Sequence, residues 1–253
     1  MTRLAYCVLS ESDRLRDVPL MGVEGAQVSL AVAAGLAVAS SHVREDALPP
    51  TLPRVRAYAH VVESLHSAAT VLPFRYGCFA KNGAELESLL GTRGRQFKAA
   101  LQELHDCEEM TVRVLLKDQA PAVRAGPALA PTAVSGAAYL AGLRDYYSAR
   151  ESLESDAAAT AEALRLAFRG LYVKLEVDHS PSGGGPLLSV HFLVFRKDVG
   201  RFREAFERLQ ETGDARMLLT GPWPLYHFAG GAGRQAEDPQ EFPAIQASGL
   251  RRS

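Results

Sequence analysis

The chain has 253 residues, of which 47% are hydrophobic and 23% charged, a balance typical of a globular protein with a sizeable core. The formal net charge is −1, which argues against a nucleic acid or an acidic membrane surface as partner. The N-terminal residues do not form a basic segment followed by an apolar run, so we expect no secretion signal. The longest weakly polar run, 28–40, is too short to span a bilayer. The three cysteines are widely spaced without a C-x-x-C pair, which indicates free thiols in a reducing cytoplasm.

Strand-like and helical patterns follow one another in the first third of the chain. Residues 4–9 form an apolar run that predicts a strand, and 18–23 and 35–43 are two further strand candidates. The Ala-rich stretch 29–38 is equally compatible with a helix at its start. After a break marked by three prolines, apolar residues at helical spacing predict an amphipathic helix over 54–68.

The next segment predicts a strand, then a helix in two parts. The strand covers 71–76, and Asn82 is expected to cap the helix that follows. Gly91 and Gly94 are expected to interrupt that helix, which then resumes. Alternating apolar residues over 110–116 predict a half-buried strand.

These elements predict an α+β fold with two domains. Strands around two helices indicate a ferredoxin-like α/β sandwich over residues 1–117. Residues 118–132 are rich in Ala and Pro, which is typical of a linker. A C-terminal α+β domain is expected over 133–229, and the tail 230–253, which contains Gly, Pro and Gln, is expected to be flexible.

The C-terminal domain is predicted to hold a long helix and a small antiparallel sheet. Apolar residues after the linker recur near one helical face, as one bent helix or as two. Strands over 171–177 and 188–195 are expected to pair as a hairpin around the loop 180–185. A short amphipathic helix over 202–209 and a last strand over 215–219 complete the domain.

The segment Thr-Gly-Pro-Trp-Pro-Leu-Tyr-His-Phe at 220–228 gathers aromatic residues, including the only Trp of the chain. Proline fixes φ and has no N–H, so Pro222 and Pro224 argue against a regular strand or helix here. The pattern predicts a stiff, extended segment whose large rings either meet a partner or close the protein's own core.

Three segments together resemble one known family. Residues 220–228 resemble the GPWPPYSF-type ending of the GvpL/GvpF family of gas vesicle proteins, with Leu225 in place of a proline and His227 in place of a small residue. Val-Leu-Pro-Phe-Arg-Tyr-Gly at 71–77 resembles the family's VLPxRFG segment, although Cys78 follows where the family has Thr. A weaker match is Gly-Ala-Ala-Tyr-Leu at 136–140, like the G-x-x-Y-L that opens the family's long central helix.

The resemblance implies a non-enzymatic, minor structural or assembly protein of gas vesicles in the cytoplasm. It implies two α+β domains, the first a modified ferredoxin-like fold, and contact with the small hydrophobic shell protein GvpA and with other gas vesicle proteins. It implies no nucleic acid, membrane or cofactor. The motif residues expected to bind the partner or to brace the domains are Phe74, Arg75, Tyr76, Trp223, Tyr226 and Phe228.

The residue patterns of catalysis and metal binding are not found in the sequence. His60 and His66 lie six residues apart on the predicted helix and therefore on different faces, and no H-E-x-x-H motif occurs. The run His-Asp-Cys-Glu-Glu at 105–109 is interpreted as a polar turn, because neighbours in sequence point in divergent directions. We therefore expect no catalytic residue, no metal site and no enzyme.

Two alternatives remain open at this point. The Gly91–Gly94 spacing, with Arg93, Arg95 and Lys98 nearby, is similar to the G-x-x-G loop of a KH RNA-binding domain, although an acidic cluster close by would oppose a polyanion. The other alternative is a ferredoxin-like module that binds a small ligand in an apolar pocket.

Overall fold

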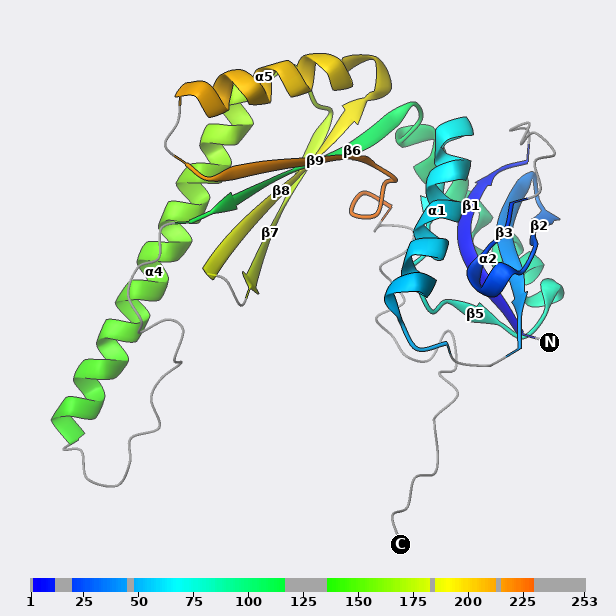
Figure 1. Cartoon of the computed structure of the whole chain (residues 1–253), viewed down its shortest axis with the longest axis horizontal. Coiled ribbons are helices and arrows are strands. Elements are labelled where there is room, and N and C mark those ends of the chain that lie inside the picture. Colours follow the sequence, from blue (N-terminus) through cyan, green and yellow to red (C-terminus); the bar gives the residue numbers. More distant parts are fainter. Residues whose placement is uncertain are drawn as a thin grey trace, which may run out of the picture. The chain divides into compact units, whose positions relative to one another are not determined.

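The computed structural model describes residues 2–11, 20–44, 48–116, 136–182, 185–212 and 215–229. The described chain is an α+β protein with two antiparallel sheets and four α-helices (Figure 1). It forms two compact units, the first made of Met1–Glu109 and the chain from Trp223 onward, the second of Met110–Pro222. The predicted linker 118–132 and the predicted tail 230–253 lie outside the described residues.

The sheet of the first unit has the strand order β2-β3-β1-β4, with β5 also paired to β1. The β2–β3 hairpin turns at Ala34 and Gly35, whose φ values of 55° and 74° suit the tight turn between two strands. The helical alternative for 29–38 is therefore wrong, because Ala-rich residues here form a hairpin. The strand bounds are β1 Thr2–Ser10, β2 Val28–Ala33, β3 Leu36–Val43, β4 Leu72–Pro73 and β5 Phe79–Ala80.

Two predicted strands of this unit are shorter than expected or absent. Residues 20–23 form no strand beyond a single bridge at Met21, and Val23–Gly25 is a 3-10 turn, while 18–19 lie outside the described residues. The strand predicted over 71–76 is reduced to β4, because the chain turns at Tyr76 and Gly77, where φ reaches 96° at the glycine.

Two helices cover the two faces of this sheet. Helix α1 (Leu52–Ala68) packs in one core cluster with Tyr6, Ala37 and Ala39, whereas α2 (Gly83–Glu103) lies against Leu36. Successive strand residues point to opposite faces, so α1 and α2 lie on opposite sides of β3. The sheet of the first unit thus has one helix on each face.

Helix α2 is continuous, which corrects the prediction that Gly91 and Gly94 interrupt it. Its N-cap is Asn82 as predicted, and the Asn82 side chain accepts a hydrogen bond from the Glu85 N–H at 3.0 Å. The Glu85 carboxylate in turn accepts from the N–H of Lys81, the residue before the N-cap. Because both glycines lie inside a helix, no G-x-x-G loop exists here and the KH-like alternative is wrong.

The second unit holds a sheet in the order β7-β8-β6-β9 and two helices. Its core gathers apolar residues of β6, β8, α4 and α5, among them Val112, Phe192, Leu164 and Phe202. The element bounds are β6 Cys107–Leu115, α4 Gly136–Ala167, β7 Lys174–Ser182, β8 Gly185–Phe195, α5 Val199–Thr212 and β9 Met217–Trp223. The stretch left open as one helix or two is the single helix α4.

The strand predicted over 110–116 belongs to this second sheet, although the ferredoxin-like arrangement expected over 1–117 counts it in the first. Its alternating residues Met110, Val112 and Val114 are buried in the second core. The β7–β8 hairpin is also longer than predicted, because pairing continues from Lys174 opposite Leu193 to Ser182 opposite Gly185. Strand therefore replaces most of the predicted loop 180–185.

Strand β9 extends through Pro222, where a regular strand was not expected. It lies at the edge of the sheet, beside β6 only. A proline at an edge costs no ladder hydrogen bond when its missing N–H would face outward. No helix in the described part of the chain is both long and apolar enough to cross a membrane.

Candidate functional site

The C-terminal aromatic segment, residues 223–229, belongs to the first unit and divides its side chains between core and solvent. Leu225 is fully buried, and Phe228 and Ala229 are nearly so. Trp223 and Tyr226 are 41% and 39% exposed, which is unusual for rings of this size. The segment is therefore anchored by aliphatic and aromatic side chains while it presents two others outward.

Glu109 fixes this segment through its carboxylate. The His227 backbone N–H donates to Glu109 Oε2 at 2.9 Å, and His227 Nδ1 donates to Oε1 at 2.6 Å. Glu109 is only 2% exposed, so both hydrogen bonds form in a poorly hydrated place where they are strong. A short turn inside the segment, in which the Ala229 N–H donates to the Leu225 carbonyl at 2.8 Å, holds its shape.

The second sequence motif, residues 71–77, lies in the same unit. Val71 and Leu72 are buried, and the Phe74 N–H donates to the Tyr6 carbonyl at 2.9 Å, which extends the pairing beyond β4. Phe74 and Tyr76 are half-buried and Arg75 is exposed. The first residues of the motif are therefore part of the core, and its last residues lie nearer the surface.

Tyr58 of α1 connects the first strand with this motif. Its hydroxyl lies 3.2 Å from the Ala5 carbonyl oxygen, 3.1 Å from that of Tyr6 and 2.9 Å from that of Phe74. Its ring meets the Tyr76 ring edge-on at 5.4 Å between centroids. A break in the β1–β3 register falls between Ala5 and Cys7, so Tyr58 satisfies carbonyl groups at an irregular point of the sheet.

Tyr58 and Tyr226 both have a phenol whose pKa is raised. Burial, with smaller effects from neighbours that include Cys78 and Tyr226, raises the pKa of Tyr58 well above its usual value. Burial is also the main reason why the pKa of Tyr226 is raised, and the carboxylates of Glu63 and Glu109 add to it. Both phenols therefore stay protonated at neutral pH, and the Tyr58 hydroxyl donates to the backbone carbonyl groups named above.

The predicted site residues thus fall into two groups. Phe228 is buried in the first unit, and the Tyr76 ring lies against the Tyr58 ring. Arg75, Trp223 and Tyr226 are exposed. Sequence reasoning missed Glu109 as the residue that holds the segment, because it lies 118 positions from His227 and no spacing rule links the two.

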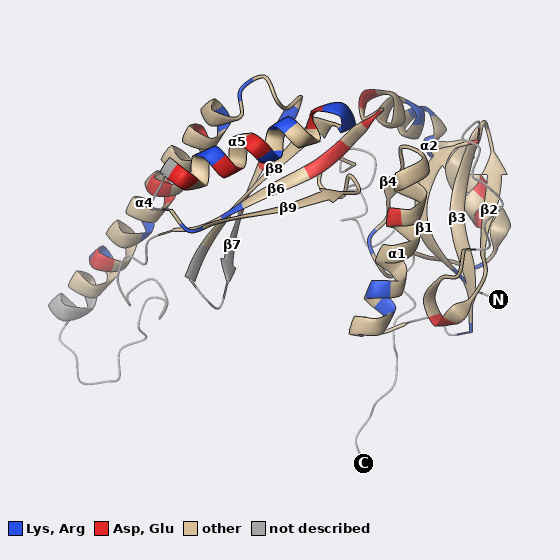
Figure 2. Cartoon of the chain, turned by 45° about the horizontal axis from the view of Figure 1, so that its top comes forward, with Lys and Arg blue, Asp and Glu red and all other residues tan. Residues whose placement is uncertain are grey.

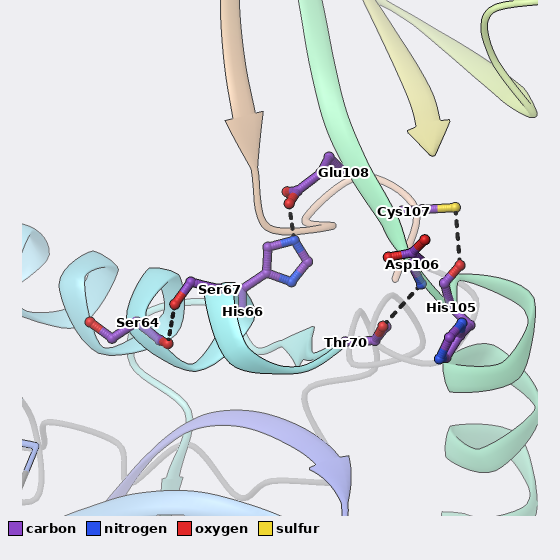
Figure 3. A network of polar contacts seen from close by, with 8 residues as sticks. All are labelled: Ser64, His66, Ser67, Thr70, His105, Asp106, Cys107 and Glu108. Carbon is purple, nitrogen blue, oxygen red and sulfur yellow. Dashed lines mark hydrogen bonds and ion pairs between the residues drawn. The ribbon is translucent and has the colours of Figure 1, made fainter. Parts of the chain in front are cut away.

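Of the polar run 105–109, only His105 and Asp106 lie in the predicted turn, whereas Cys107, Glu108 and Glu109 begin strand β6, which corrects the prediction (Figure 3). The Asp106 N–H donates to Thr70 Oγ1 at 3.3 Å, and His66 Nε2 lies 2.8 Å from Glu108 Oε2. Cys107 is fully buried and its thiol donates to the His105 carbonyl at 3.5 Å. These contacts tie the end of α1 to the start of β6.

The comparisons with known proteins agree with this architecture. A family model described as "Gas vesicle synthesis protein GvpL/GvpF" matches residues 2–230. "Gas vesicle protein L" of Streptomyces sp. (strain CB03234) is 30% identical over 200 residues, which cover 74% of this chain and 72% of the relative. These matches define a gas vesicle protein.

Crystal structures of GvpF resemble the fold at 16% sequence identity. The GvpF of Microcystis aeruginosa matches with a TM-score of 0.71 over 90% of this chain and 98% of its own. The GvpF of Anabaena sp. PCC7120 matches with the same TM-score over 90% of this chain and 95% of its own. The chain belongs to the GvpL/GvpF family, which implies a role in gas vesicle formation, and members of this family are not known as enzymes.

Proposed function

We propose that this protein is a minor structural or assembly protein of gas vesicles that binds the small hydrophobic shell protein GvpA in the cytoplasm and assists the nucleation or assembly of the shell. The observation that carries the proposal is the pair of exposed rings of Trp223 and Tyr226 on a segment fixed by Leu225, Phe228 and Glu109. Family membership supports the vesicle as the place of action.

The physical argument concerns the apolar surface of a shell subunit before incorporation. A subunit that keeps one face of the shell dry exposes apolar area while it is free, and such area binds whatever covers it. Rigid aromatic rings bury a large area with little loss of conformational entropy. The exposed Trp223 and Tyr226 are suited to this contact, with Arg75 as a further exposed polar candidate, while Phe74, Tyr76 and Phe228 support the framework.

A pull-down against the GvpA-type shell protein of the same organism tests the proposal. We expect the wild-type chain to capture the shell protein, and Trp223→Ala and Tyr226→Ala to capture at least about tenfold less, as for hot-spot aromatics. Tyr147→Ala is the matched control, because Tyr147 is an aromatic residue of α4 that is 54% exposed in the second unit. Circular dichroism should show all four chains equally folded.

Two outcomes would count against the proposal. If the wild-type chain captures no shell protein, direct contact with GvpA is wrong and another vesicle protein is the partner. If Trp223→Ala and Tyr147→Ala capture equally well, the shell protein binds elsewhere on the surface.

A further inference from the structure

We draw no further inference here: the strongest candidate, the side-chain cluster in which Ser29, Ser40 and His42 hold the guanidinium of Arg3 beside Gly83 at the start of α2, rests on polar contacts at a helix N-terminus, and no second observation in the described part of the chain points to a ligand there.

Discussion

The Tyr58 hydroxyl carries one hydrogen but lies within reach of three backbone carbonyl oxygens in a buried place. We predict that Tyr58→Phe lowers the free energy of unfolding by about 1–3 kcal/mol, because it leaves buried acceptors without a donor. Tyr76→Phe is the matched comparison: the Tyr76 hydroxyl is buried and has no partner among the described residues, so its removal should cost nothing or stabilise. Urea denaturation of the three chains measures both effects, and equal losses would contradict the prediction.

The sequence identified Tyr58 as an apolar residue of an amphipathic helix, and the structure confirms its burial. Its polar role was hidden, because the carbonyl groups that it reaches lie 52 and 53 residues before it and 16 after it. The same limit applies to Glu109, which the sequence placed in a polar turn. Hydrogen bonds between segments far apart in the sequence depend on the fold, so no residue spacing in the sequence reveals them.

Helix α2 shows how a helix tolerates two glycines. A Cβ added at Gly91 would meet no atom within 4 Å, and one added at Gly94 would meet Leu36 Cδ1 at 3.8 Å, an ordinary contact. We predict that Gly91→Ala raises the free energy of unfolding by about 0.5–1 kcal/mol, because alanine loses less backbone entropy in a helix. Thermal denaturation checks this, and a loss of stability would indicate that residue 91 is not helical.

The C-terminal aromatic segment depends on one carboxylate for two of its hydrogen bonds. We predict that Glu109→Ala speeds hydrogen exchange of the backbone amides over 223–229, because the His227 N–H loses its acceptor. Mass spectrometry should detect this while the amides of α5 in the second unit exchange at the wild-type rate. Unchanged exchange at 223–229 would show that the buried Leu225 and Phe228 hold the segment without Glu109.

Periodicity predicted the existence of most elements, and prolines and glycines misled where tertiary pairing overrode them. Pro222 lies in an edge strand, and pairing with β8 carries β7 through Pro181 to Ser182. Strands β7 and β9 are both edge strands, where a proline costs no ladder hydrogen bond if its missing N–H would face outward. For this reason, the residues at which strands β7 and β9 end could not be predicted from the sequence.

The first unit as a whole should be sensitive to alkali. Burial raises the pKa of Tyr6 and Tyr58 above their ordinary value of 10.0, and burial also raises the pKa of the thiols of Cys7 and Cys78 above 9.0. The folded chain therefore keeps protons that the unfolded chain releases, so stability is fully present below pH 9 and falls as the pH rises through the folded-state values.

We predict a decline that begins near pH 9 and steepens above pH 10, with a slope of up to about 1.4 kcal/mol per pH unit for each group. Urea denaturation at a series of pH values measures it, and phenolate absorbance should rise together with unfolding. A free energy of unfolding that stays constant between pH 8 and 11 would contradict the burial of these groups.

The motifs predicted the family, because residues 71–77 and 220–228 carry specific combinations of proline and aromatic residues. The division of the chain into two units could not be predicted from sequence motifs. Strand 110–116 has the pattern of any half-buried strand, and its alternation does not say which of two sheets it joins. Acidic and basic residues are mixed on the helices of both units, so the charge pattern does not indicate to which unit an element belongs (Figure 2).

The first unit takes its sheet from one end of the chain and its aromatic segment from the other, with the second unit between them. During synthesis, the ribosome therefore releases Tyr58 and Glu109 on the order of ten seconds before Leu225 and Phe228 exist to cover their part of the core. Until then the surface that receives the segment is open. The surface formed by Trp223 and Tyr226 therefore cannot exist before this segment has been synthesised, so a chain truncated before Trp223 cannot display it.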